Sequence, residues 1–111
     1  MTHKELEDYL LQLPKVWLDY PFGEGTAVYK HGDKDGDAKI VAIIAEGSKP
    51  LRISLKCEPQ LAELLRDKYE TVVPGYHLSK KHWNTILCTG QVADDELVDL
   101  MRHSYELVSN S

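Results

Sequence analysis

Residues 74–85, late in the chain, combine side chains that attract phosphate with side chains that offer stacking surfaces. The segment holds Lys80 and Lys81, the aromatic residues Tyr76 and Trp83, and no acid. Lysine attracts phosphate by charge, and an aromatic ring provides a flat face against which a base stacks. This composition therefore predicts contact with a nucleic acid, or with an acidic or amphipathic peptide.

A second acid-free segment, residues 48–57, carries Lys49, Arg52 and Lys56. Between Leu51 and Lys56, apolar and polar residues alternate, which predicts a strand with one buried face and one wet face. Arg52 and Lys56 then point to the wet face together. The two segments supply the residues that we expect to bind DNA or a partner: Arg52, Lys56, Tyr76, His77, Lys80, Lys81, His82 and Asn84.

Trp83 is assigned to the core instead. It is a large aromatic residue at the start of an apolar strand that continues to Ile86 and Leu87. Such a residue typically anchors a core, and its replacement by alanine there costs about 3–5 kcal/mol. We therefore expect Trp83 to contribute more to stability than to recognition.

No metal site is predicted. Residues 33–37 have the acid spacing that begins a calcium-binding EF-hand loop, but Ala38 stands where the glycine is required and Ile44 where the glutamate is required. A solvated hairpin turn explains this segment better. His77 and His82 have no carboxylate or cysteine nearby and are not spaced for one helical face.

Catalytic machinery is not recognisable either. No G-x-S-x-G elbow or glycine-rich phosphate loop occurs, and neither Cys57 nor Cys88 has a neighbouring histidine. We therefore expect a non-enzymatic protein without a cofactor. A small enzyme that uses His77 or His82 is the least favoured class.

The 111 residues suit a single domain, 1–111, with 42% apolar and 28% charged residues. The net charge of −5 argues against coating nucleic acid by bulk attraction, although the acid-free segments give a polarised distribution. Two distant cysteines predict free thiols in a reducing compartment, hence a cytoplasmic protein. Residues 1–8 do not resemble a secretory signal, and the longest apolar run, 40–45, is too short to span a membrane.

Three amphipathic helices and several short strands should position the candidate residues. A capping box at Thr2 and Glu5 begins the first helix, Pro59 begins the second, and acids at 94–96 begin the third. The apolar stripe expected on the second helix consists of Leu61, Leu64 and Leu65, and the inward stripe expected on the third consists of Leu97, Leu100, Met101, Ser104 and Val108. Residues 15–25 should form a loop, and Pro74-Gly75 a type II turn. The expected strands are 26–31, 38–45, 51–56, 72–73 and 83–89. The order predicts an α+β domain with an antiparallel sheet packed against helices.

The chain resembles the MmcQ/YjbR family. The similarity begins with Tyr20-Pro21-Phe22-Gly23 and continues with Leu55-Lys56-Cys57, Pro59 and Leu64-Leu65-Arg66. It extends through Pro74-Gly75-Tyr76-His77-Leu78, Lys80 and His82-Trp83-Asn84-Thr85 to Ser104-Tyr105-Glu106-Leu107-Val108. The resemblance implies an α-β(3)-α-β(2)-α domain similar to type III secretion chaperones. It also implies DNA binding through a "double wing" arrangement.

Two hypotheses of function therefore stand. The first is a DNA-binding domain that uses the basic and aromatic residues. The second is a protein-interaction module, monomeric or homodimeric, that grips a peptide as a chaperone does. Salt separates them, because affinity for DNA falls steeply with salt and apolar peptide capture changes little.

Overall fold

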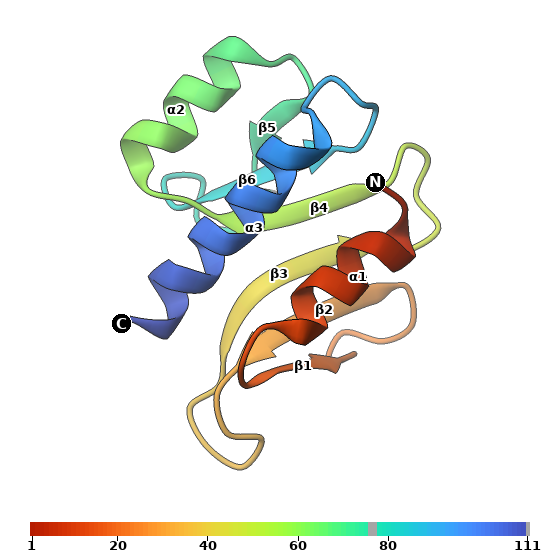
Figure 1. Ribbon diagram of the computed structural model, residues 1–111, viewed down its shortest axis with the longest axis vertical. Helices are drawn as coiled ribbons and strands as arrows, with labels where there is room; N and C mark the ends of the chain where they lie inside the picture. The colour runs from red at the N-terminus through yellow and green to blue at the C-terminus, as the bar shows by residue number, and fades with distance from the viewer. Residues whose placement is uncertain (76–77, 111) are drawn as a thin grey trace.

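The computed structural model describes residues 1–75 and 78–110. The described residues form one six-stranded antiparallel sheet, in the order β1-β2-β3-β4-β6-β5, together with three helices (Figure 1). This confirms the predicted α+β class. In chain order the elements are α1 (His3–Gln12), β1 (Val16–Asp19), β2 (Thr26–His31), β3 (Lys39–Ala45), β4 (Arg52–Lys56), α2 (Pro59–Lys68), β5 (Val72–Pro74), β6 (Trp83–Leu87) and α3 (Asp94–Ser109).

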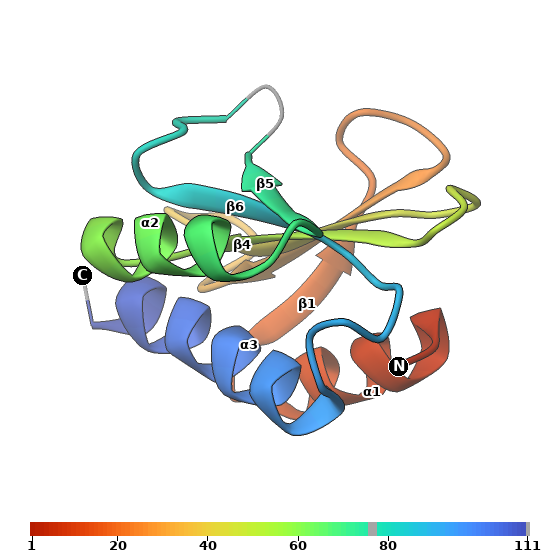
Figure 2. The ribbon, with the colours of Figure 1, turned by 90° about the horizontal axis from the view of Figure 1, so that it is seen from above.

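All three helices lie against one face of the sheet, and the other face, here called the open face, carries no helix (Figure 2). The core fills the space between the helices and the sheet, with Tyr29, Ile44, Ile53 and Met101 among its fully buried side chains. Two segments project on the side of the open face: residues 20–25, between β1 and β2, and residues 78–82, before β6 (Figure 2).

The helix ends follow the sequence signals. Thr2 Oγ1 accepts the Glu5 backbone N–H at 3.2 Å, and Glu5 Oε1 accepts the Thr2 backbone N–H at 2.9 Å, which completes the predicted capping box. Pro59 occupies the first turn of α2, and acids fill the first turn of α3. The predicted inward stripe of α3 is confirmed, since Leu97, Leu100, Met101, Ser104 and Val108 are all buried.

The register of β4 also matches its predicted alternation. Ile53 and Leu55 are buried in the core, whereas Arg52 is exposed and Lys56 is half-buried. Ser54 Oγ lies 2.8 Å from Thr85 Oγ1 of β6, so these directly paired residues share the open face. Leu51 precedes the strand and is half-buried.

Ser104 joins α3 to the sheet where two strands separate. The β3–β4 register ends at the Ala42–Leu55 pair. One residue further on, Ser104 Oγ donates to the Val41 carbonyl at 2.6 Å and accepts the Lys56 backbone N–H at 3.0 Å. The fully buried hydroxyl thereby continues the hydrogen bonding between β3 and β4 beyond the end of the ladder.

Residues 15–25 were expected to form a loop, and this is wrong for Val16–Asp19. These four residues form β1, an edge strand paired with β2, so four strands rather than three precede α2. Val16 and Leu18 pack against the core on one face of β1. The strand is too short for its alternation to stand out between Pro14 and Pro21.

The predicted type II turn at Pro74-Gly75 is also wrong, because Gly75 does not adopt a positive φ. Pro74 ends β5, and the Gly75 N–H donates to the Trp83 carbonyl at 2.9 Å. A Cβ on Gly75 would lie 2.7 Å from the Cβ of Trp83. Glycine is required here for close approach of the chains, not for a left-handed turn.

The helices and the cysteines also bear on two predictions made from the sequence. No helix among the described residues has the length and apolar character needed to cross a membrane. Both cysteines are free, as predicted, with Cys57 buried and Cys88 half-buried.

Candidate functional site

Strand pairing assembles the open face as rows of side chains. One row crosses all six strands through directly paired residues: Asp19, Val28, Ile43, Ser54, Thr85 and Val73. A neighbouring row contains Thr26, Ala45, Arg52 and Leu87. The middle of the face is therefore a mixture of apolar side chains and hydroxyl groups.

A groove of about 460 Å³ lies over these rows. Phe22 and Leu78 line it from the two projecting segments, and Arg52 is the cation among its described lining residues. The remaining lining residues come from the strands: Thr26, Ile43, Ala45, Ser54 and Thr85. The Phe22 side chain is 68% exposed, which leaves its ring available to a bound molecule.

The Arg52 guanidinium group has no partner among the described residues. Among residues 1–75 and 78–110, none forms a hydrogen bond or an ion pair with its side chain. Lys30, at the β1 end of the open face, is different, because its Nζ lies 3.0 Å from Asp19 Oδ2 and 5.5 Å from the centre of the Trp17 ring. Unpaired positive charge on the strands therefore concentrates toward β4.

Further cations lie where β4 ends and β6 begins. Lys56 is paired with Trp83 in the register, and Lys80, Lys81 and His82 are exposed in the segment that leads into β6. This segment is fixed by its backbone, since the Cys57 N–H donates to the His82 carbonyl at 2.8 Å. The Arg66 guanidinium donates to the Lys80 carbonyl, also at 2.8 Å. The structure thus brings Lys56, Lys80, Lys81 and His82 to one end of the sheet.

Asn84 does not belong to this surface. It is 2% exposed and faces the helices, where its Nδ2 donates to the Ala62 carbonyl at 3.2 Å and its Oδ1 accepts from Arg66 at 3.2 Å. A buried amide with both ends hydrogen-bonded fixes α2 to β6 and is not available to a ligand. The predicted role of Asn84 in binding is therefore wrong.

Trp83 also differs from its predicted place. It shares the open face with Lys56 and Thr85, and it is half-buried outside the core cluster. Its Cβ packs closely against Gly75 of the neighbouring segment. The expected core anchor is thus a partly exposed aromatic residue beside the cations. Tyr76 and His77, the other two candidate residues of this segment, lie outside the described residues.

The charges separate between the two sides of the molecule. The helices contain ten of the eighteen acids and four of the thirteen Lys and Arg residues, so they carry a net charge of −6. The rest of the chain carries +1. The two acid-free segments, 48–57 and 71–93, contain β4, β5 and β6, which are neighbours in the sheet.

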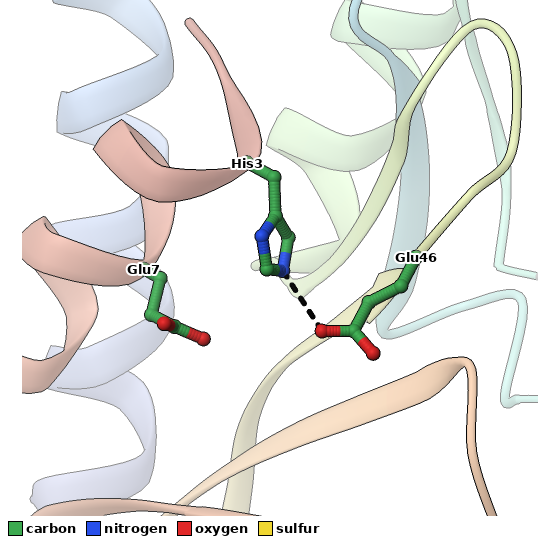
Figure 3. A group of neighbouring side chains, drawn as sticks. All are labelled: His3, Glu7 and Glu46. Carbon is green, nitrogen blue, oxygen red and sulfur yellow. Dashed lines mark ion pairs between the residues drawn. The ribbon is translucent and has the colours of Figure 1, made fainter.

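A separate cluster is formed by His3, Glu7 and Glu46 (Figure 3). Their ligand atoms lie within 4.8 Å of one another, and no other described residues bring three such groups together. An imidazole nitrogen with two carboxylates is a donor set that divalent transition metals accept. This cluster was not predicted from the sequence, although His3 and Glu7 are spaced for one face of α1.

The same three residues already have protein partners. His3 Nε2 lies 3.1 Å from Glu46 Oε2, and Tyr20 donates to that carboxylate at 2.9 Å. Tyr29 donates to Glu7 at 2.6 Å, and burial together with this hydrogen bond raises the pKa of the Tyr29 phenol. These contacts connect α1 to β2 and to the end of β3, which explains the cluster as a structural tie.

Comparison with known proteins identifies the family. A family model described as YjbR matches residues 11–107. The chain belongs to the YjbR family. It is 34% identical over 106 residues to YbdF of Escherichia coli O157:H7, which covers 96% of this chain and 83% of that protein. It is 37% identical over 71 residues to YjbR of Escherichia coli K12, which covers 64% of this chain and 60% of that protein.

Solved structures of other bacterial proteins have the same fold. A crystal structure of a Deinococcus radiodurans protein with a DUF419 domain has a TM-score of 0.95 and 36% identity, covering 99% of this chain and 80% of that one. A crystal structure of a Pseudomonas syringae protein has a TM-score of 0.80 and 28% identity, covering 97% and 99%. YbdF and YjbR are described only as uncharacterized proteins, so kinship gives the family and the fold but no activity.

Proposed function

We propose that this YjbR-family protein is a non-enzymatic nucleic-acid-binding domain that uses the open face of β4 and β6. One observation carries the proposal: the two acid-free segments, separate in sequence, lie on adjacent strands and combine Lys49, Arg52, Lys56, Lys80 and Lys81 without an acid. A phosphate backbone requires such a local set of cations when the net charge of the protein is negative.

The arrangement supports contact along a backbone. Arg52 and Lys56 begin and end β4 on the open face, about 13 Å apart at the rise of a β-strand. Lys80 and Lys81 continue the cations beyond Lys56. Trp83, half-buried beside Lys56, offers part of its ring to a base. The acidic helices face away from this surface and do not oppose the phosphates.

Most of these contacts would be electrostatic and would carry little sequence information. We therefore expect binding with weak sequence preference and a strong dependence on salt. Fluorescence anisotropy of a labelled random-sequence duplex, at about 50 and about 200 mM salt, measures both properties. The affinity should fall steeply between the two concentrations.

The double variant Lys80→Glu/Lys81→Glu tests the surface itself. It should abolish most of the affinity and lower the slope of log affinity against log salt by about two units, one for each lost phosphate contact. Lys34→Glu/Lys39→Glu is the matched control, because it makes the same charge change beside the acidic turn 33–37. Absence of duplex binding by the wild type at about 50 mM salt refutes the proposal.

A protein-interaction module is the second candidate, and the apolar side chains in the groove favour it. Phe22, Ile43 and Leu78 would contact apolar groups of a peptide. Binding of this kind changes little with salt and has a negative heat-capacity change. A partner whose affinity is the same at both salt concentrations would favour this function over the first.

A further inference from the structure

The groove on the open face has the size and lining of a small-molecule site. Its volume, about 460 Å³, falls in the range of about 300–1,000 Å³ that ligand pockets occupy. Such pockets are mainly apolar and contain a few polar groups that orient the ligand. Ile43, Ala45, Phe22 and Leu78 provide the apolar part here, and Thr26, Ser54 and Thr85 provide the hydroxyl groups.

One charged side chain is found among the described residues that line the groove. Arg52 is the lone ionisable residue among the described residues that line the groove, and no described residue pairs with its guanidinium. A guanidinium fork matches a carboxylate, with two parallel N–H donors. One cation complements one negative charge, whereas a polyphosphate or a metal ion would require several charged ligands.

We infer that the groove binds a small amphipathic monoanion, a carboxylate attached to an apolar chain or ring. The carboxylate lies against Arg52, and the apolar body lies on Ile43 and Ala45 beneath Phe22. This site does not depend on the proposed binding of nucleic acid, although Arg52 contributes to both surfaces. A duplex is too thick to enter the groove and would contact only its rim.

The hydroxyl groups are consistent with this orientation. Ser54 Oγ and Thr85 Oγ1 hydrogen-bond to each other at 2.8 Å, so one of the two hydroxyl groups uses its hydrogen in this bond and the other keeps its hydrogen for a ligand. The floor of the groove therefore offers a few hydroxyl groups beside its apolar side chains, which suits a ligand body that is mainly apolar. The strongest polar contact that the described lining offers to a ligand is the Arg52 guanidinium group.

Octanoate is a suitable probe, with 1-octanol as its uncharged counterpart. Titration of the isotope-labelled full chain, followed by amide NMR shifts, measures both affinity and location. Octanoate should shift the amides of Thr26, Ile43, Ser54 and Thr85 and leave the helices largely unchanged. 1-Octanol should bind at the same place with an affinity lower than that of octanoate by about tenfold or more, because it lacks the charge-assisted hydrogen bond.

Substitution of two exposed residues separates the contribution of charge from that of apolar contact without loss of the fold. Arg52→Gln should weaken octanoate about tenfold and leave 1-octanol unchanged. Phe22→Ala should weaken both probes. Lys68→Gln, on α2, is the control for general loss of positive charge and should alter neither.

The inference is overturned if octanoate and 1-octanol bind equally well, or if Arg52→Gln binds octanoate like the wild type. Octanoate shifts confined to the helices would also overturn it. An oligonucleotide that shifts these four amides when octanoate does not would overturn it too, and would assign the groove to bases. Because the octanoate and 1-octanol titrations contain no nucleic acid, a negative result in them leaves the proposed function standing.

Discussion

Replacement of Ser104 by alanine tests the connection between α3 and the sheet. The Ser104 hydroxyl is fully buried and serves two backbone groups, the Val41 carbonyl at 2.6 Å and the Lys56 N–H at 3.0 Å. Alanine fits the helix and removes only the oxygen. The variant therefore isolates the hydrogen bonds from the packing.

The magnitude follows from what is left unpaired. A buried backbone group that loses its partner costs about 1–3 kcal/mol, so the two groups together should lower the free energy of unfolding by about 2–6 kcal/mol. This is a large share of the about 5–15 kcal/mol that stabilises a small domain. With a urea slope of about 2 kcal/mol per molar, the unfolding midpoint should fall by about 1–3 M.

Urea denaturation followed by circular dichroism measures this loss. Ser109→Ala is the matched control on the same helix, because the Ser109 hydroxyl reaches only the Glu106 carbonyl, at 3.5 Å. It should change the stability by less than about 0.5 kcal/mol. If Ser104→Ala also stays within that range, the hydroxyl does not hold β3 and β4 together as argued.

Three further predictions concern single side chains. Burial raises the pKa of the Cys57 thiol to about 11. At pH 8 iodoacetamide should therefore label Cys57 slowly in the native protein and rapidly once urea unfolds it. Rapid labelling of the native protein would contradict the burial. Gly75→Ala would place a Cβ 2.7 Å from that of Trp83 and should lower the Tm by about 4 °C or more. In the control Gly36→Ala, the new Cβ meets its nearest atom at 3.5 Å, so the Tm should not fall in this way. Equal Tm values for the two variants would show that β5 and β6 adjust freely. The hydrogen bond from Lys30, followed by that from the Tyr20 backbone N–H, lowers the pKa of Asp19 below 3.8, and Lys30→Met should return it toward 3.8 in an NMR titration. Because the folded-state pKa is the lower one, the stability that Asp19 contributes is present above pH 3.8 and is lost as the pH falls through the lowered value.

Local patterns predicted much of the fold. The stripe of α3 and the alternation of β4 each depend on a burial period that is visible in one segment. The stripe of α2 was less exact: Leu65 is buried, but Leu64 is 65% exposed and Ala62 is buried in its place. A ten-residue helix that covers the end of a sheet presents a narrow face, and its rotation is set by tertiary packing.

The site was harder to predict, because its parts meet only through the fold. Phe22 and Leu78 line one groove from segments far apart in the sequence. The side of the sheet that Asn84 faces follows from the β6 register, which a strand with apolar residues on both faces does not reveal. The signals available in the sequence were an aromatic residue, Phe22, in a Pro-Phe-Gly segment and hydroxyl residues at alternate strand positions.

The separation of charge gives the molecule an electric dipole directed across the sheet, and screening decides what an approaching polyanion experiences. The Debye length is about 8 Å at 0.15 M salt, while the shortest extent of the molecule is 26 Å. At that ionic strength a phosphate near β4 interacts with the nearby cations and hardly at all with the acids of the helices. At about 0.01 M salt the Debye length grows to about 30 Å, and the whole charge of −5 repels the same phosphate. The isoelectric point is therefore a poor guide to the partners of this protein, and the rate of encounter with a polyanion should pass through a maximum as salt is added.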